Sequence, residues 1–190
     1  MAICFCHCLS QIDNEWPVWL LQHHKEKKHA IGTAKIAELS LSNCLTFDDR
    51  FAKKQNVFVN ALEVSQPLLV YPGKNAINVA VLSNLETRPL LFLDGSWRKT
   101  RKLFYTYPQL ENLTRIAFTP EKESRYRIRK EPDEKSVSTL EAIVSVLSTL
   151  ENNEEKYQTM LGTMDWMINK QIEYMGEETY KKNYQNKVKN

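Results

Sequence analysis

Short apolar runs alternate with helical segments along this chain, and this alternation constrains the fold more than any other feature. The runs are residues 16–21, 67–71, 89–93 and 115–118, all of them mostly apolar. Strands that are apolar on both faces are typical of parallel sheets that helices cover on both sides. We therefore expect an α/β fold with a mainly parallel sheet flanked by helices.

The helical segments are predicted from apolar residues that recur at helical spacing. They are residues 33–41, 98–104, 142–150 and 154–174, while residues 58–64 fit either a short strand or a helix. In the first segment, Ile36, Ala37 and Leu39 are expected to face inward. In the third, Ser138 followed by Glu141 has the spacing of a capping box, which predicts a helix start.

The length of 190 residues and the 42% share of hydrophobic residues fit one domain with its own core. No stretch approaches the roughly 20 apolar residues of a membrane span, and the N-terminus lacks the pattern of a signal peptide. We expect a cytoplasmic protein without membrane contact. Its parts would be a cysteine-containing segment at 1–15, a single domain at 16–180 and a basic tail at 181–190.

Polar residues follow three of the apolar runs, where each predicted strand ends. They are residues 23–26, 71–74 and 94–97, and ligands of open α/β sheets bind beyond such carboxyl ends. Asp94 could accept a proton, Gly95 permits close approach of the backbone to a ligand, and Trp97 could stack on a base. The same residues could instead form an ordinary turn, with Trp97 packed in the core.

The sequence lacks the motifs of several common enzyme classes. The chain has no Walker loop, no dinucleotide fingerprint, no zinc-protease motif and no serine-hydrolase elbow. Its net charge of +3 does not by itself indicate nucleic acid, but basic residues gather at 98–102 and 122–130, whereas residues 133–155 are mostly acidic or neutral. The basic runs could line a phosphate-binding face, or they could be solvated surface.

The cysteines do not resemble a disulfide framework. Cys4, Cys6 and Cys8 have C-x-C spacing, which bridges poorly, and the cytosol keeps thiols reduced. They are expected to be free thiols or metal ligands. Zinc could be held by these three with His7 or Cys44, but the spacing is unusual for a zinc knuckle, so zinc is the less favoured alternative.

Several separated segments together resemble one protein family. The string LFLDGSWRKTRKLFYTYPQLENL, followed by SRYRIRKEP and STLEA, resembles the DTW-domain family of tRNA-uridine aminocarboxypropyltransferases. The family is named after a D-x-[TS]-W motif, which here is Asp94, Ser96 and Trp97. The resemblance covers about residues 4–150 and keeps the order of several motifs.

Other family elements match in part. His23 and Glu26 are similar to the family's H-P-x-E, with His24 in place of the proline. Residues 32–35 resemble its N-T-G-R, and residues 71–73 its Y-P element. The family commonly has a C-x-x-C before a C-x-C near its N-terminus, and here no first pair precedes the C-x-C.

The resemblance implies a fold related to the knotted α/β methyltransferases of the SPOUT class. It also implies that uracil N3 of a tRNA attacks the γ-carbon of S-adenosylmethionine (SAM), with methylthioadenosine as the leaving group. Asp94 would accept the N3 proton. SAM would lie among the loops after Val70, Leu93 and Phe118 and beside Ser138, and Arg129 or the Ser138 helix start would hold its carboxylate.

Site residues follow from the same resemblance and from the polar and basic segments above. The candidates for SAM binding are Tyr71, Pro72, Gly73, Leu93, Asp94, Gly95, Ser96, Arg129, Ser138, Thr139, Leu140 and Glu141. The candidates for tRNA contacts are His23, Glu26, Thr33, Lys35, Trp97, Arg98, Lys99, Arg101, Lys102, Arg125 and Arg127. Glu26 could instead pair with Lys28.

Two other functions stay open from the sequence. A SPOUT-type RNA methyltransferase would use the same pocket and release S-adenosylhomocysteine. A noncatalytic RNA-binding module would bind tRNA without SAM. The oligomeric state is also open, because many SPOUT proteins are homodimers.

Overall fold

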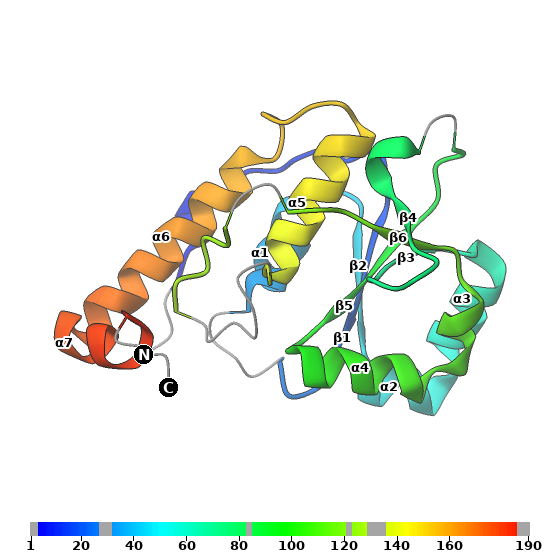
Figure 1. Ribbon diagram of the computed structural model, residues 1–190, viewed down its shortest axis with the longest axis horizontal. Helices are drawn as coiled ribbons and strands as arrows, with labels where there is room; N and C mark the ends of the chain where they lie inside the picture. The colour runs from blue at the N-terminus through cyan, green and yellow to red at the C-terminus, as the bar shows by residue number, and fades with distance from the viewer. Residues whose placement is uncertain (1–3, 27–31, 83–84, 121–122, 129–135, 186–190) are drawn as a thin grey trace.

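Six strands form one sheet in the computed structural model, and every neighbouring pair runs parallel (Figure 1). The structure describes residues 4–26, 32–82, 85–120, 123–128 and 136–185. The strands are β1 (Val18–Gln22), β2 (Cys44–Asp48), β3 (Leu68–Val70), β4 (Ile77–Asn78), β5 (Leu90–Asp94) and β6 (Arg115–Ala117). Their order is β2-β1-β5-β3-β6-β4, so β5 lies between two strands that precede it in the sequence.

Helices cover both faces of the sheet (Figure 1). One face carries α1 (Thr33–Ser40), α5 (Thr139–Leu150) and α6 (Gln158–Met175), and the other carries α2 (Asp49–Gln55), α3 (Val57–Ser65) and α4 (Trp97–Thr106). The short α7 (Glu177–Tyr180) follows α6. Side chains alternate between the faces, so Leu90 and Phe92 of β5 enter the first core and Leu91 and Leu93 the second.

The predicted α/β fold with a parallel sheet is confirmed. The four apolar runs form β1, β3, β5 and β6, the predicted helices form α1, α4, α5 and α6, and residues 58–64 lie in α3. Leu39 is 40% exposed, so its predicted inward position is wrong. α1 instead buries its small residues Ala34, Ala37 and Ser40 together with Ile36, and Leu39 lies outside that face.

The sequence pattern does not reveal β2 or β4, and both are edge strands. β2 has one neighbour, buries only Phe47 and leaves Leu45 48% exposed, so no continuous apolar run marks it. β4 consists of two exposed residues at the opposite edge. Edge strands need fewer apolar residues because one of their sides contacts no other strand.

The described part of the N-terminal segment packs against the rest of the domain. Ile12 is buried in the core and forms a parallel bridge with Leu41. The carbonyl of Cys8 accepts a hydrogen bond from Thr163 Oγ1 at 2.8 Å, and the His7 ring meets the Trp166 ring edge-on. Among the described residues, every helix is too short or too polar to cross a bilayer.

The parallel register brings the carboxyl ends of the central strands to one level. Gln22 ends β1 and lies opposite Asp48 of β2 on one side and Asp94 of β5 on the other. The loops that follow these strands therefore meet at one edge of the sheet.

Candidate functional site at the carboxyl edge of the sheet

A cavity of about 410 Å³ opens where β3, β5 and β6 end, beside the N-terminus of α5. Its apolar wall includes Val70, Phe92 and Phe118, and its polar groups include Ser136. Seven of the predicted site residues also line it: Tyr71, Pro72, Leu93, Gly95, Trp97, Ser138 and Thr139. The structure thus brings the loops after β3, β5 and β6 together with the start of α5 around one space.

Asp94 ends β5 with both carboxylate oxygens hydrogen-bonded. Thr139 Oγ1 donates to Oδ1 at 2.7 Å, and Gln22 Nε2 donates to Oδ2 at 2.8 Å. Asp94 is 7% exposed, and its partner Thr139 lines the cavity. Donors on both oxygens favour the ionised carboxylate.

Gln22 also lies at this edge, although no sequence motif marks it as a site residue. It lies beside Asp94 because β1 and β5 are parallel neighbours in register. The sequence does show that the apolar runs of β1 and β5 are each followed by a polar residue. It does not show that these two strands are neighbours, because local sequence does not determine strand pairing.

Gly95 allows three segments to approach closely. A Cβ at this position would lie 3.0 Å from the Cβ of Lys99 on α4 and 3.7 Å from the Cβ of His23 after β1. The first distance is tighter than ordinary Cβ contacts, so a larger residue would push the first turn of α4 outward. Gly95 therefore keeps α4 against the end of β1.

Glu26 and Lys99 form an ion pair across the same edge. Lys99 Nζ lies 2.6 Å from Glu26 Oε1, and the two side chains are 20% and 18% exposed. Both were predicted to contact tRNA, but here the Lys99 charge faces Glu26. The pair links the loop after β1 to α4. Lys99 is thus less exposed than Arg98, Arg101 and Lys102 of the same basic run.

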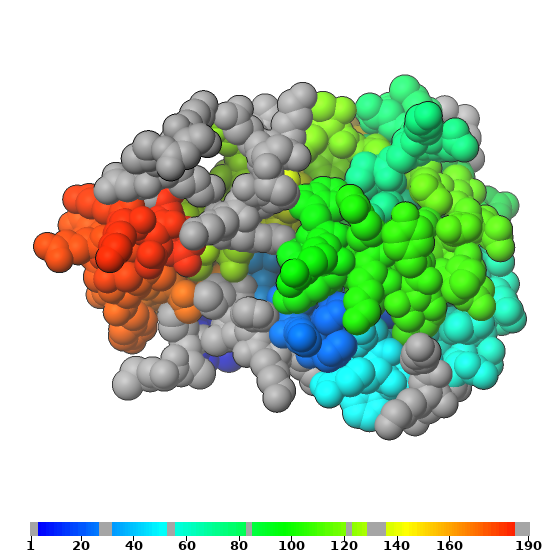
Figure 2. Space-filling view, turned by 60° about the horizontal axis from the view of Figure 1, so that its bottom comes forward, coloured from blue at the N-terminus to red at the C-terminus, as the bar shows by residue number. Residues whose placement is uncertain are grey.

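The remaining basic residues of α4 lie on an exposed face. Figure 2 shows α4 (green) beside the loop after β1 (blue) and α2 (cyan) on one side of the molecule. Arg98, Arg101 and Lys102 are exposed, and Tyr105 on the same helix is 69% exposed. Their spacing along the helix places these residues on neighbouring turns.

Trp97 begins α4 at the mouth of the cavity. It is 43% exposed and lines the cavity, so the alternative that it packs in the core is wrong. Its Nε1–H donates to Ser136 Oγ at 3.1 Å, and its ring meets that of Tyr71 edge-on at 6.3 Å between centroids. The indole is therefore held in place while part of it stays accessible to a ligand.

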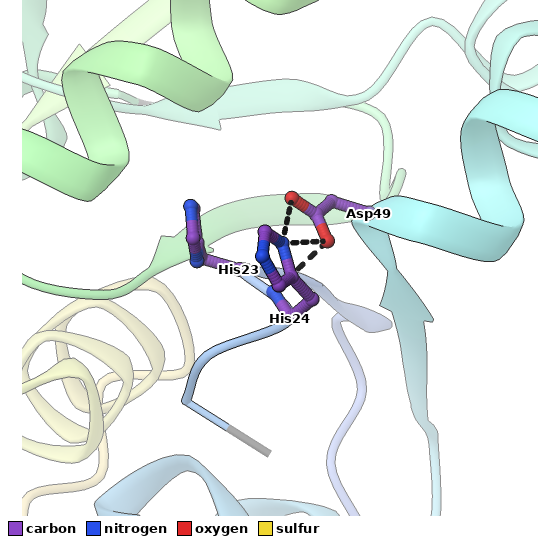
Figure 3. A group of neighbouring side chains, drawn as sticks. All are labelled: His23, His24 and Asp49. Carbon is purple, nitrogen blue, oxygen red and sulfur yellow. Dashed lines mark hydrogen bonds and ion pairs between the residues drawn. The ribbon is translucent and has the colours of Figure 1, made fainter. Parts of the chain in front are cut away.

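Two histidines and an aspartate cluster next to this edge (Figure 3). The rings of His23 and His24 stack with centroids 4.3 Å apart and planes 24° from parallel. His24 Nδ1 lies 3.0 Å from both carboxylate oxygens of Asp49, on the side away from His23. One ring nitrogen of each histidine and one carboxylate oxygen of Asp49 lie within 4.8 Å of one another, and these are atom types that bind transition metals.

His23 is fixed in one tautomer by its surroundings. It is 3% exposed, and burial lowers its pKa against the opposing influence of Asp49. Its Nδ1 accepts a hydrogen bond from the backbone N–H of Lys25 at 3.2 Å. A neutral ring whose Nδ1 is an acceptor carries its proton on Nε2.

Glu141 links the start of α5 to the segment before it. Its Oε2 accepts from the backbone N–H of Ser138 at 2.7 Å and from Ser124 Oγ at 2.8 Å, and its Oε1 accepts from the backbone N–H of Arg125 at 2.6 Å. Ser138 Oγ accepts in turn from the Glu141 N–H, so the predicted capping box is confirmed. Asp94, Glu141 and the fully buried Leu140 are not among the residues that line the cavity, and neither are Gly73 and Ser96.

Four predicted tRNA contacts are buried or have a partner within the protein. Thr33 is buried at the start of α1, and Lys35 pairs with Glu38 at 2.8 Å. Arg125 pairs with Asp165 of α6 at 3.0 Å, and Arg127 Nη2 donates to Asn169 Oδ1 of α6 at 2.6 Å. The predicted carboxylate anchor Arg129 lies outside the described residues, as does Lys28.

The four cysteines are free thiols. A hydrogen bond from the backbone of Cys6 lowers the pKa of Cys4, the Cys4 side chain raises the pKa of Cys6, and burial raises the pKa of Cys44 to about 12. Although all four lie in the described ranges, no three of them, with or without His7, come close enough to share a metal ion.

Thiol labelling at pH 7.5 is expected to separate these cysteines. Cys4 is exposed and its thiolate is favoured, so it should react with iodoacetamide at least about tenfold faster than Cys44. Peptide mass spectrometry over time measures both rates, and the unfolded chain should remove the difference. Equal rates in the folded chain would contradict the placement of Cys44, and labelling of Cys4, Cys6 and Cys8 only after chelator treatment would show a bound metal.

Comparison with known proteins identifies relatives over most of the chain. A profile of the DTW domain matches residues 1–172. The protein named tRNA-uridine aminocarboxypropyltransferase 2 of Drosophila melanogaster is 26% identical over 198 residues, which cover 97% of this chain and 79% of that protein. Proteins of the same name from Macaca fascicularis and Mus musculus are each 24% identical over 83% and 88% of the chain, which spans 55% and 58% of their lengths. No solved structure matches.

Proposed function

The chain belongs to the DTW-domain family, and from this we propose that it is a tRNA-uridine aminocarboxypropyltransferase. The enzyme transfers the 3-amino-3-carboxypropyl group of SAM to N3 of a uridine and releases methylthioadenosine. The observation that carries the proposal is the meeting of two separate motifs at one cavity. Trp97 of the D-x-S-W motif lines this cavity together with Ser138 and Thr139 of the STLEA segment, and Asp94 lies directly behind the lining, where it accepts a hydrogen bond from Thr139.

The cavity suits SAM in its chemistry. Apolar side chains of Val70, Leu93 and Phe118 offer a surface for the adenosine. The capping box uses the N–H groups of Ser138 and Glu141, so those of Thr139 and Leu140 would be the donors to a carboxylate at the start of α5. SAM supplies activated carbons next to its sulfonium, and the residues around it decide which carbon faces the nucleophile. Arg129 stays our candidate for the cation that holds the amino acid end, and a SPOUT-like knot among the three loops is part of the same proposal.

Asp94 is the proton acceptor in this proposal. A uracil N3–H is a weak acid, so a charged carboxylate beside it assists the attack of N3. The ionised form of Asp94 is favoured by the two donors on its oxygens. Trp97 is accessible at the cavity mouth, where an unpaired uracil could stack on its indole.

The exposed face of α4 is the proposed docking surface for tRNA phosphates. Replacing Arg98, Arg101 and Lys102 together by Ala is expected to weaken tRNA binding and to reduce the slope of log affinity against log salt by about 2 to 3. Binding titrations across a salt series measure this. Lys170, Lys181 and Lys182, on α6 and beyond α7, provide the control triple.

Lys99 distinguishes phosphate contacts from internal pairing. Because it faces Glu26, Lys99→Ala alone should change the salt slope by less than any one of the three exposed residues does. A triple variant with an unchanged slope would mean that α4 is only solvated surface.

The product of the reaction tests the proposed function. Wild-type protein is incubated with SAM and unmodified tRNA, and the nucleosides and sulfur products are quantified by mass spectrometry. We expect one methylthioadenosine for each 3-(3-amino-3-carboxypropyl)uridine formed. Accumulation of S-adenosylhomocysteine would identify a methyltransferase, and tRNA binding without any SAM-dependent product would identify a noncatalytic module.

A further inference from the structure

Among the described residues, Gln22 and Thr139 donate hydrogen bonds to the Asp94 carboxylate, and the two donors are of different kinds. Thr139 belongs to α5 and lines the cavity, so its hydroxyl is accessible to a ligand. Gln22 belongs to β1, is partly buried and is not among the residues that line the cavity. Asp94 is not among those lining residues either, so Gln22 would influence a ligand in this cavity through Asp94, which bonds to the lining residue Thr139.

The chemistry of the two donors also differs. A hydroxyl can rotate and can donate or accept, so Thr139 could turn toward a bound ligand. The side-chain amide of Gln22 must present its NH₂ to the ionised carboxylate. In the flipped orientation its carbonyl oxygen would face an Asp94 oxygen, and both atoms are acceptors. Gln22 is therefore a constant donor to Oδ2 at 2.8 Å.

The support of Gln22 is rigid. β1 has strand neighbours on both sides, with Gln22 opposite Asp48 and Asp94 in the register. The backbone N–H of the next residue, His23, donates to the carbonyl of Asp94 at 3.1 Å. The backbones of Asp94 and Gln22 are thus fixed relative to each other, which keeps the two side chains within hydrogen-bonding reach.

We propose that Gln22 is a positioning residue that orients the Asp94 carboxylate and keeps it ionised as the proton acceptor. This inference rests on the proposed function. A fixed donor on Oδ2 stabilises the charged form over the protonated form and sets the plane of the carboxylate. The cost is a weaker base, and the gain is a base that is already deprotonated when uridine arrives.

The test is the pH dependence of single-turnover transfer, with enzyme in excess over tRNA and SAM saturating. Gln22→Met keeps the length of the side chain and loses the donor, so the acid limb of the profile should move up by about one pH unit. At a pH on that limb the rate should fall about tenfold, and above it the rate should return to within about threefold of wild type. Gln11→Met, at an exposed residue, is the matched control.

A second variant makes the test independent of packing. Gln22→Glu has nearly the same shape but places a second carboxylate against Asp94, and the pair should share a proton. Its acid limb should therefore lie higher than that of Gln22→Met. Melting temperatures and SAM affinity of both variants report on folding.

The outcomes separate this inference from the proposed function. If wild-type protein forms no modified uridine at any pH, the proposed function fails. If wild-type protein is active and both variants lose rate equally at every pH, Gln22 only supports the fold and the inference is wrong. Profiles that coincide with wild type, or with each other, would also overturn it.

Discussion

Replacing Asp94 by Asn is expected to reduce transfer of the aminocarboxypropyl group by at least about 1,000-fold, while SAM affinity stays within a few-fold. The amide keeps the shape of the carboxylate and can still bond to Thr139, but it cannot take up the uracil proton. One of its two neighbours, Thr139 or Gln22, must also adjust to the new NH₂ group. Single-turnover rates measured with excess enzyme isolate the chemical step from product release.

A matched control is available in Asp13→Asn, because Asp13 is exposed and precedes the opposite end of β1. It should transfer at the wild-type rate. If Asp94→Asn kept most of its activity under the same conditions, Asp94 would not be the base, and its two hydrogen bonds would have to be regarded as structural support for the start of α5.

The largest effect on stability is expected at Glu141. Its carboxylate accepts three hydrogen bonds, two of them from the segment at Ser124 and Arg125 and one from the N–H of Ser138. Glu141→Ala should cost about 3 kcal/mol in the free energy of unfolding, because hydrogen bonds to a charged group at a buried position are lost. For a domain of this size that corresponds to a fall in melting temperature of about 6 to 12 °C.

Glu63→Ala, at an exposed position of α3, is the control and should change the melting temperature little. Calorimetry or circular dichroism measures both variants. A Glu141→Ala variant as stable as the control would mean that water replaces the carboxylate without loss. In that case the link between α5 and the 123–128 segment would contribute nothing to the fold.

The central part of the fold could be predicted because burial on both faces leaves a local pattern. β5 is buried at all five of its residues, and β1 at three of its five, so both appear as apolar runs. The start of α5 could be predicted because the capping box depends on residues three positions apart. These features do not require knowledge of distant residues.

The missed features depend on contacts between distant segments. The ion pair of Glu26 with Lys99, the bond of Gln22 to Asp94 and the bond of His24 to Asp49 each join β1, or the loop after it, to another strand or helix. Local sequence carries no sign of which strands become neighbours. The basic character of Arg125 and Arg127 also led to the prediction that they bind tRNA together with the basic residues of α4. In the structure both contact α6.

The position of β5 between β1 and β3 has a consequence for synthesis of the protein. A nascent chain that ends before residue 90 contains β1 and β3, but the place between them is vacant, so the two strands share no hydrogen bonds. Their unpaired edges can then associate with other chains. When β5 fills that place it pairs on both sides and also delivers Asp94 to Gln22. The insertion of β5 between β1 and β3 therefore protects the two strand edges from aggregation and, in the same step, brings Asp94 and Gln22 together.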